Sequence, residues 1–198
     1  MTVLMSPPTA IPRCVVQDRG TWAMYLFIAS EAMLFVSLFF AYYYLGHDEP
    51  SWPPEPPQYR LALVMLGVLA ASSIVLHVGE RAERAGRVGR ARALVGGTAG
   101  LGLLFVALQV LEYREHLKTL RPATNAYGSI FYVITSVHGL HLLLGLSMLG
   151  YVLLLPEFGA AQRPPHGALH NAALYWHFVD VVWVVIVALV YLAPNMAR

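Results

Sequence analysis

Five apolar stretches restrict the possible fold of this chain more than any other feature of its sequence. They cover residues 21–45, 60–78, 93–111, 126–155 and 172–192. Because an α-helix rises about 1.5 Å per residue, each stretch is long enough to cross the ~30 Å hydrocarbon core of a bilayer. In lipid, only helices and closed barrels satisfy every backbone polar group, and apolar runs of this length are typical of helices. The sequence therefore predicts an all-α integral membrane protein, a bundle of five transmembrane helices.

The composition agrees with this class and excludes several others. Only 12% of the residues are charged, against about 25% in soluble domains. The single cysteine, Cys14, excludes an intrachain disulfide and a multi-cysteine metal site. Residues 1–20 hold three prolines and lack the apolar core of a signal peptide, so we expect an extended N-terminal cytoplasmic arm before a bundle over residues 21–198. We expect membrane lipids and other membrane subunits as partners, and no nucleic acid.

The basic residues predict an orientation. With the N-terminus in the cytoplasm, eight of the 13 Lys and Arg residues lie inside and five outside. Five of the eight are arginines between positions 81 and 92, in the connection between the second and third stretches. Cytoplasmic loops of membrane proteins are enriched in Lys and Arg, so this count favours a cytoplasmic N-terminus.

Five ionisable side chains lie deep within the apolar stretches, where a charge is expensive unless it faces protein or water, and His77 lies nearer the end of its stretch. They are Glu31, His138, His141, His177 and Asp180. The HxxH and HxxD spacings could supply metal ligands, and imidazole with carboxylate suits iron or zinc. However, the Glu-x-x-His pairs of di-iron sites and the widely spaced histidines of bis-histidine haem sites are absent. A proton-transport path and buried polar contacts that fix helix register both stay open, and we favour the second.

Other residues are candidates for close packing between helices or subunits. Trp176, Asp180 and Trp183 follow one stripe of the last helix at i, i+4 and i+7. Gly96 and Gly100 open the third stretch at a spacing of four, and small residues at this spacing allow two helices to approach closely.

Four motifs spread along the chain carry a resemblance to a known family. They are SEAMLF at 30–35, LQVLEY at 108–113, YGSIFYVITSVHGLHLLLG at 127–145 and YWHFVDVVW at 175–183. Their sequences and their order resemble subunit III of the haem-copper respiratory oxidases, most closely that of cytochrome c oxidase in its short five-helix bacterial form.

The resemblance implies a non-catalytic subunit in a bacterial cytoplasmic (inner) membrane. Such a subunit has no haem or copper of its own, since these lie in partner subunits. It docks directly on subunit I, in a complex with subunit II and a small subunit IV, binds phospholipid and sustains proton uptake during oxygen reduction and proton pumping. Glu31 matches the family's carbodiimide-reactive carboxylate.

The chain departs from the pattern of this family in two respects, and several alternative functions stay open. Longer members of the family have two further spans at their start, and some carry a glutamate where this chain has His170 and Asn171. The alternatives are subunit III of a quinol oxidase, a homologue associated with nitric oxide reductase and, in a different class, a membrane metalloenzyme or a proton transporter.

Overall fold

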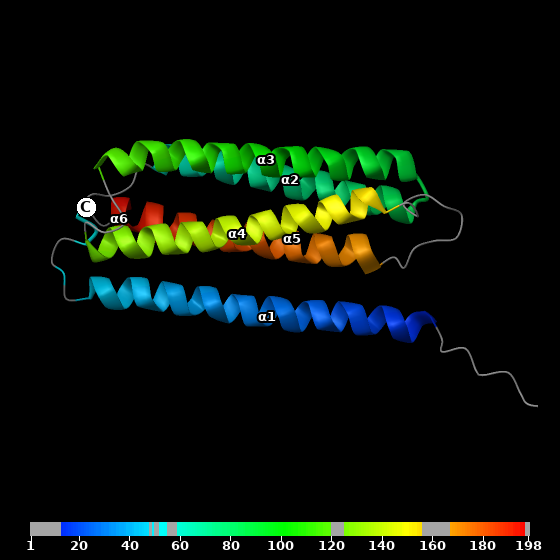
Figure 1. Cartoon of the computed structure of the whole chain (residues 1–198), viewed down its shortest axis with the longest axis horizontal. Helices are drawn as coiled ribbons and strands as arrows, with labels where there is room; N and C mark the ends of the chain where they lie inside the picture. The colour runs from blue at the N-terminus through cyan, green and yellow to red at the C-terminus, as the bar shows by residue number, and fades with distance from the viewer. Residues whose placement is uncertain are drawn as a thin grey trace, which may run out of the picture.

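The chain folds into long helices, each of which runs antiparallel to the one before it (Figure 1). The computed structural model describes residues 13–47, 49, 52–54, 59–119, 125–155 and 167–196. The helices are α1 (Arg13–Gly46), α2 (Tyr59–Arg84), α3 (Val88–Thr119), α4 (Ala126–Leu154), α5 (Gly167–Ile186), a π-helical segment η1 (Val187–Leu192) and α6 (Ala193–Met196). Five segments are long and apolar enough to cross a membrane, namely Arg19–Gly46, Tyr59–Arg84, Val88–Leu117, Ala126–Leu154 and Gly167–Leu192. The predicted all-α fold with five spans is therefore confirmed.

The bundle has three layers, with α4 and α5 in the middle. Helix α1 packs on one side of this pair, while α2 and α3 form an antiparallel hairpin on the other side (Figure 1). In the most apolar window of the last span, 50% of the residues are buried, against 6% in α1. The last helix is thus the centre of the bundle, and α1 keeps most of its surface available to lipid.

Helices α2 and α3 extend beyond the apolar stretches that predict them. Between Arg84 and Val88 the chain makes a tight turn in which Gly86 has a φ of +72°, a conformation that glycine adopts without strain. The arginine-rich segment is therefore the end of one helix and the start of the next. Arg81 and Arg84 lie in the last turn of α2, where cations interact favourably with the helix dipole.

The first helix also begins earlier than expected. Helix α1 starts at Arg13, inside the segment expected to be an extended arm, and residues 1–12 lie outside the described residues.

At another helix start, the Asn125 side chain accepts a hydrogen bond of 2.7 Å from the Gly128 N–H and caps α4.

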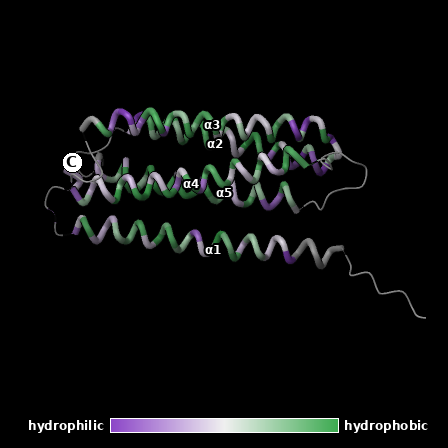
Figure 2. The backbone as a smooth tube through the Cα atoms, in the orientation of Figure 1, coloured by the Kyte–Doolittle hydropathy of each residue, from purple (hydrophilic) through white to green (hydrophobic). Residues whose placement is uncertain are grey.

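Hydrophobic residues dominate the middle of the helices, and hydrophilic ones gather toward both ends of the bundle (Figure 2). Polar residues are therefore few at intermediate depth, and those that occur there are the candidates for a functional role.

Candidate functional site

An ionisable pair joins α1 to α4 in the middle of the bundle. His141 Nε2 lies 2.8 Å from Glu31 Oε2, and His141 Nδ1 lies 2.7 Å from the Val137 carbonyl oxygen. Because a carbonyl only accepts, Nδ1 carries a proton. Nε2 then either donates to the Glu31 carboxylate as part of an imidazolium or accepts a proton from a neutral Glu31. In both forms the two residues share one proton and the pair has no net charge, which suits its depth in the membrane.

His138 lies one turn before His141 but has a different environment. Its side chain is completely buried, and neither ring nitrogen has a hydrogen-bond partner among the described residues. The ring stacks on Trp183 at a centroid distance of 5.0 Å and meets the edge of Phe105 at 5.8 Å. The two histidines of the HxxH motif therefore do not face a common site.

A second polar cluster joins α2 to α5. His177 Nδ1 lies 2.8 Å from Ser73 Oγ, and the Ser73 hydroxyl donates to the Asp180 carboxylate. Since Ser73 has one proton, His177 Nδ1 must be the donor to Ser73. The residues directly before His177 and Ser73 are also in contact, since Trp176 Nε1 donates to Ser72 Oγ at 3.0 Å. The HxxD motif is thus assembled around a serine that the sequence alone did not single out as its partner.

The two clusters do not form a common metal centre. Within the described part of the chain, no three His, Cys, Asp or Glu side chains are grouped so that they could hold a metal ion. The structure brings His177 and Asp180 together, brings His141 to Glu31, and leaves His138 among aromatic rings.

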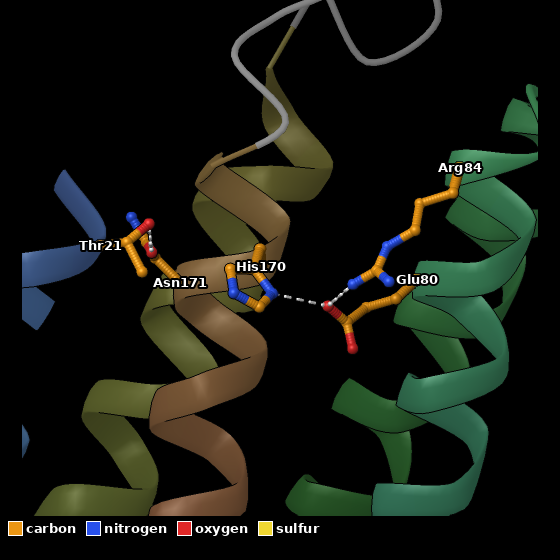
Figure 3. A network of polar contacts seen from close by, with 5 residues as sticks. All are labelled: Thr21, Glu80, Arg84, His170 and Asn171. Carbon is orange, nitrogen blue, oxygen red and sulfur yellow. Dashed lines mark hydrogen bonds and ion pairs between the residues drawn. The ribbon is translucent and has the colours of Figure 1, made fainter. Parts of the chain in front are cut away.

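A third network, shown in Figure 3, lies at the end of the bundle that carries the α2–α3 turn. Glu80 Oε1 lies 3.2 Å from His170 Nδ1 and 3.5 Å from a guanidinium nitrogen of Arg84, and Thr21 Oγ1 donates to Asn171 Oδ1 at 3.3 Å. Glu80 was missed because it belongs to an arginine-rich run that resembles a solvated face. Its only sequence signal is the i, i+4 spacing to Arg84.

The residues predicted to pack between helices or subunits fall into two groups, buried tryptophans and glycines without close neighbours in the described residues. Trp176 and Trp183 are completely buried within this chain's own bundle. By contrast, a Cβ added at Gly96 or Gly100 would meet no atom within 4 Å, so neither glycine marks a close helix contact among the described residues. Contact with another subunit at these two glycines stays a prediction.

The close approaches are made by two other glycines. A Cβ at Gly102 of α3 would lie 2.6 Å from Trp176, and one at Gly145 of α4 would lie 3.0 Å from the same indole. The Trp176 ring is therefore held between α3 and α4 where both lack a side chain.

The sequence is similar to known proteins over nearly its whole length. Residues 12–194 match the family described as cytochrome c oxidase subunit III. The cytochrome c oxidase subunit 3 of Synechocystis is 39% identical over 179 residues, which cover 88% of this chain and 76% of that protein. The corresponding subunit of Thermostichus vulcanus is 35% identical, with 88% of both chains covered. That of the zebrafish Danio rerio is 34% identical, with 89% of this chain and 70% of the relative covered. The chain belongs to the cytochrome c oxidase subunit III family and is a multi-pass, non-catalytic subunit of that respiratory complex.

Proposed function

We propose that this chain supports the catalytic subunit I of a proton-pumping oxidase in a bacterial inner membrane. It packs beside subunit I, retains phospholipid and helps to sustain proton uptake, in a complex that also holds subunit II and a small subunit IV. The observation that carries the proposal is the contact between Glu31 and His141. It connects the least buried helix to the centre of the bundle through a pair without net charge.

The arrangement of polar groups favours this supporting role over transport by the chain itself. A proton path needs groups that follow one another within hydrogen-bond reach. In the described residues, the contacts of the Glu31–His141 pair end at the Val137 carbonyl, and no hydrogen bond joins the pair to the cluster around Ser73. Glu31, His141, His177 and Asp180 each take part in a polar contact between helices, as expected of residues that fix the geometry of a bundle.

Two surface features support the retention of phospholipid. Helix α1 exposes large apolar side chains along its length, including Leu26, Met33 and Phe40. At the end with the α2–α3 turn, five arginines between positions 81 and 92 are exposed. A basic cluster at a membrane surface attracts anionic headgroups, each nearby Arg contributing about 1 kcal/mol. With this end at the cytoplasmic surface, the arginine cluster would contact the headgroups of the cytoplasmic leaflet. This is the side of the membrane from which cytoplasmic protons enter.

The substitution Glu31→Gln tests the role of the pair in the assembled oxidase. Glutamine keeps a group that can hydrogen-bond His141 but cannot take up or release a proton. We expect initial turnover and proton pumping close to those of the wild type, measured by stopped-flow proton release from the reconstituted complex. Removal of the whole subunit is expected to slow proton uptake and to shorten the working life of the enzyme.

The substitution Glu31→Ala is the matched control, because it removes the contact together with the proton. We expect it to shorten the working life while initial pumping is retained. Complete loss of pumping in Glu31→Gln, with oxygen reduction preserved, would show that Glu31 is an obligatory proton carrier and would refute the supporting role.

A further inference from the structure

The side of α5 that faces away from the bundle carries a polar group at mid-depth in the membrane. Val181 and Val184 follow His177 by four and seven residues on the same stripe of the helix, and they are 61% and 50% exposed. His177 is itself partly exposed. It lies ten residues after Gly167, where the last span begins, and hence about 15 Å from that end along the helix. An imidazole therefore faces outward near the middle of a hydrocarbon core that is about 30 Å thick.

The contacts of His177 place a proton on its outer ring nitrogen. Nδ1 lies 2.8 Å from Ser73 Oγ, and Ser73 in turn bonds to the Asp180 carboxyl group. The membrane interior favours the forms of this cluster that have no net charge. With an ionised Asp180, neutrality requires an imidazolium, in which both nitrogens carry protons. With a protonated Asp180, the two Ser73 bonds reverse, Nδ1 accepts, and the imidazole proton lies on Nε2. In both neutral forms Nε2 is a hydrogen-bond donor.

This donor has no acceptor within the described part of the chain. No hydrogen bond among the described residues reaches Nε2 of His177. His77 and Glu80 of α2 are close enough to interact with the ring electrostatically, but the Glu80 carboxylate bonds to His170 and Arg84 instead. A hydrogen-bond donor that faces lipid tails without an acceptor is strongly disfavoured.

The exposed hydroxyl groups on two other faces of the bundle do not have this problem. Ser30 and Ser37 of α1 and Ser147 of α4 each donate to a carbonyl oxygen three or four residues earlier in the same helix. These faces can meet lipid tails with their polar groups satisfied. The face formed by α2 and α5 differs, because it presents a donor that lipid tails cannot satisfy.

We propose that the face of α2 and α5 around His177 docks on a transmembrane helix of the catalytic subunit, and that His177 Nε2 donates to an oxygen acceptor on that helix. The inference rests on the proposed function and adds the docking face to it. Phospholipid oxygens lie at the headgroups, about 15 Å away, so the acceptor belongs to a protein. Ala70, one turn before Ser73, is exposed and small, and small residues let a partner helix approach closely.

Two substitutions separate docking from packing within the bundle. His177→Asn keeps an amide near the position of Nδ1, so it retains a partner for Ser73 but loses the outward donor. His177→Gln places its amide near the position of Nε2, so it retains the outward donor but loses the bond to Ser73. Ser37→Ala is the control, because it removes an exposed hydroxyl from α1.

The measurement is the rate at which this subunit leaves the complete purified oxidase in a timed detergent challenge. We expect roughly 3- to 30-fold faster release in His177→Asn, the range for loss of one hydrogen bond between helices in a membrane. Release should be slower in His177→Gln than in His177→Asn, and Ser37→Ala should match the wild type. The reverse order of the two His177 variants, or wild-type release in both, would overturn the proposal.

Photo-cross-linking identifies the partner, and it decides the matter if His177→Asn does not assemble. Cys14, the single cysteine, is replaced by serine. A benzophenone attached at Val181→Cys should then cross-link to the catalytic subunit, whereas the same probe at Met33→Cys of α1, a position of similar exposure, should react with lipid. Reaction of the Val181 probe with lipid alone, or with a second copy of this chain, would refute the docking face but leave the proposed function standing. Absence of the wild-type chain from the purified oxidase would refute both.

Discussion

The close contact between Gly102 and Trp176 makes the packing of α3 against this indole testable by a single substitution. In Gly102→Ala, the new Cβ would lie 2.6 Å from Cη2 of Trp176 and 2.9 Å from Cδ2 of Leu146. Carbon atoms in favourable contact are about 3.5–4.0 Å apart, so α3 or the indole must move by roughly an ångström.

The indole has little freedom to move. Trp176 is completely buried, its Nε1 donates to Ser72, and Gly145 of α4 closes the other side. Extra atoms in such a well-packed core cost about 1–3 kcal/mol. Alanine also favours the helix over glycine by about 0.5–1 kcal/mol, which offsets part of that cost. We therefore expect Gly102→Ala to lower the free energy of unfolding by up to about 2.5 kcal/mol, the difference of these two terms.

Gly100→Ala is the control for the helix preference alone. Gly100 lies on the same helix, and its added Cβ would meet nothing within 4 Å. The free energies of unfolding of the two variants should therefore differ by the packing term, about 1–3 kcal/mol. The measurement is denaturation of the full chain in mixed detergent micelles, followed by tryptophan fluorescence. Equal stability of the two variants would refute the packing of α3 against Trp176.

Two further predictions concern orientation and the indole. A cysteine introduced as Gly89→Cys should react with a membrane-impermeant reagent only from the cytoplasmic side, because the surrounding arginines favour that side; labelling of intact cells from the periplasm would contradict this orientation. Trp176→Phe should lower the free energy of unfolding by about 0.5–1.5 kcal/mol for the lost hydrogen bond, plus a packing term. In a double-mutant cycle with Ser72→Ala, the two effects should not add; strict additivity would exclude the hydrogen bond.

The number of spans could be predicted from the sequence, but their ends could not. Hydropathy detects the part of a helix that lies in lipid, whereas the helix itself continues until its backbone is capped or turned. Arg, Glu and Ala are good helix formers, so α2 continues through the polar run to Arg84 and α3 begins at Val88. The same reasoning accounts for the start of α1 at Arg13, ahead of the apolar stretch.

The ionisable residues of the candidate site were predictable, but their partners were not. Residues three apart on a helix point about 60° away from each other. This difference suffices for His141 to reach Glu31 on α1 while His138 packs on Trp183. The outcome depends on how each helix is rotated about its axis, and the sequence motif carries no information about this rotation.

The positions of close contact between helices could not be predicted from the glycine motif either. The pair Gly96 and Gly100 has the spacing typical of close helix contacts, yet both face open space within this chain. The contacts are made by Gly102 and Gly145, which lie on different helices and form no local motif. Small residues permit a close approach, but a large partner such as Trp176 determines where it occurs.

The polar contacts of the last span occur at three levels along its length. Near its start, His170 and Asn171 bond to α2 and α1; in the middle, His177 and Asp180 bond to Ser73 of α2; near its end, Tyr191 lies beside the Glu112 carboxyl group of α3. Lipid tails are as apolar as leucine, so hydrophobicity does not distinguish one helix register from another within the bilayer. A slip of one residue moves every group by about 1.5 Å along the axis and rotates it by about 100°, which would break all three levels together. We infer that the intramembrane polar residues of this helix specify its register, and that their spacing follows the positions of neighbouring helices.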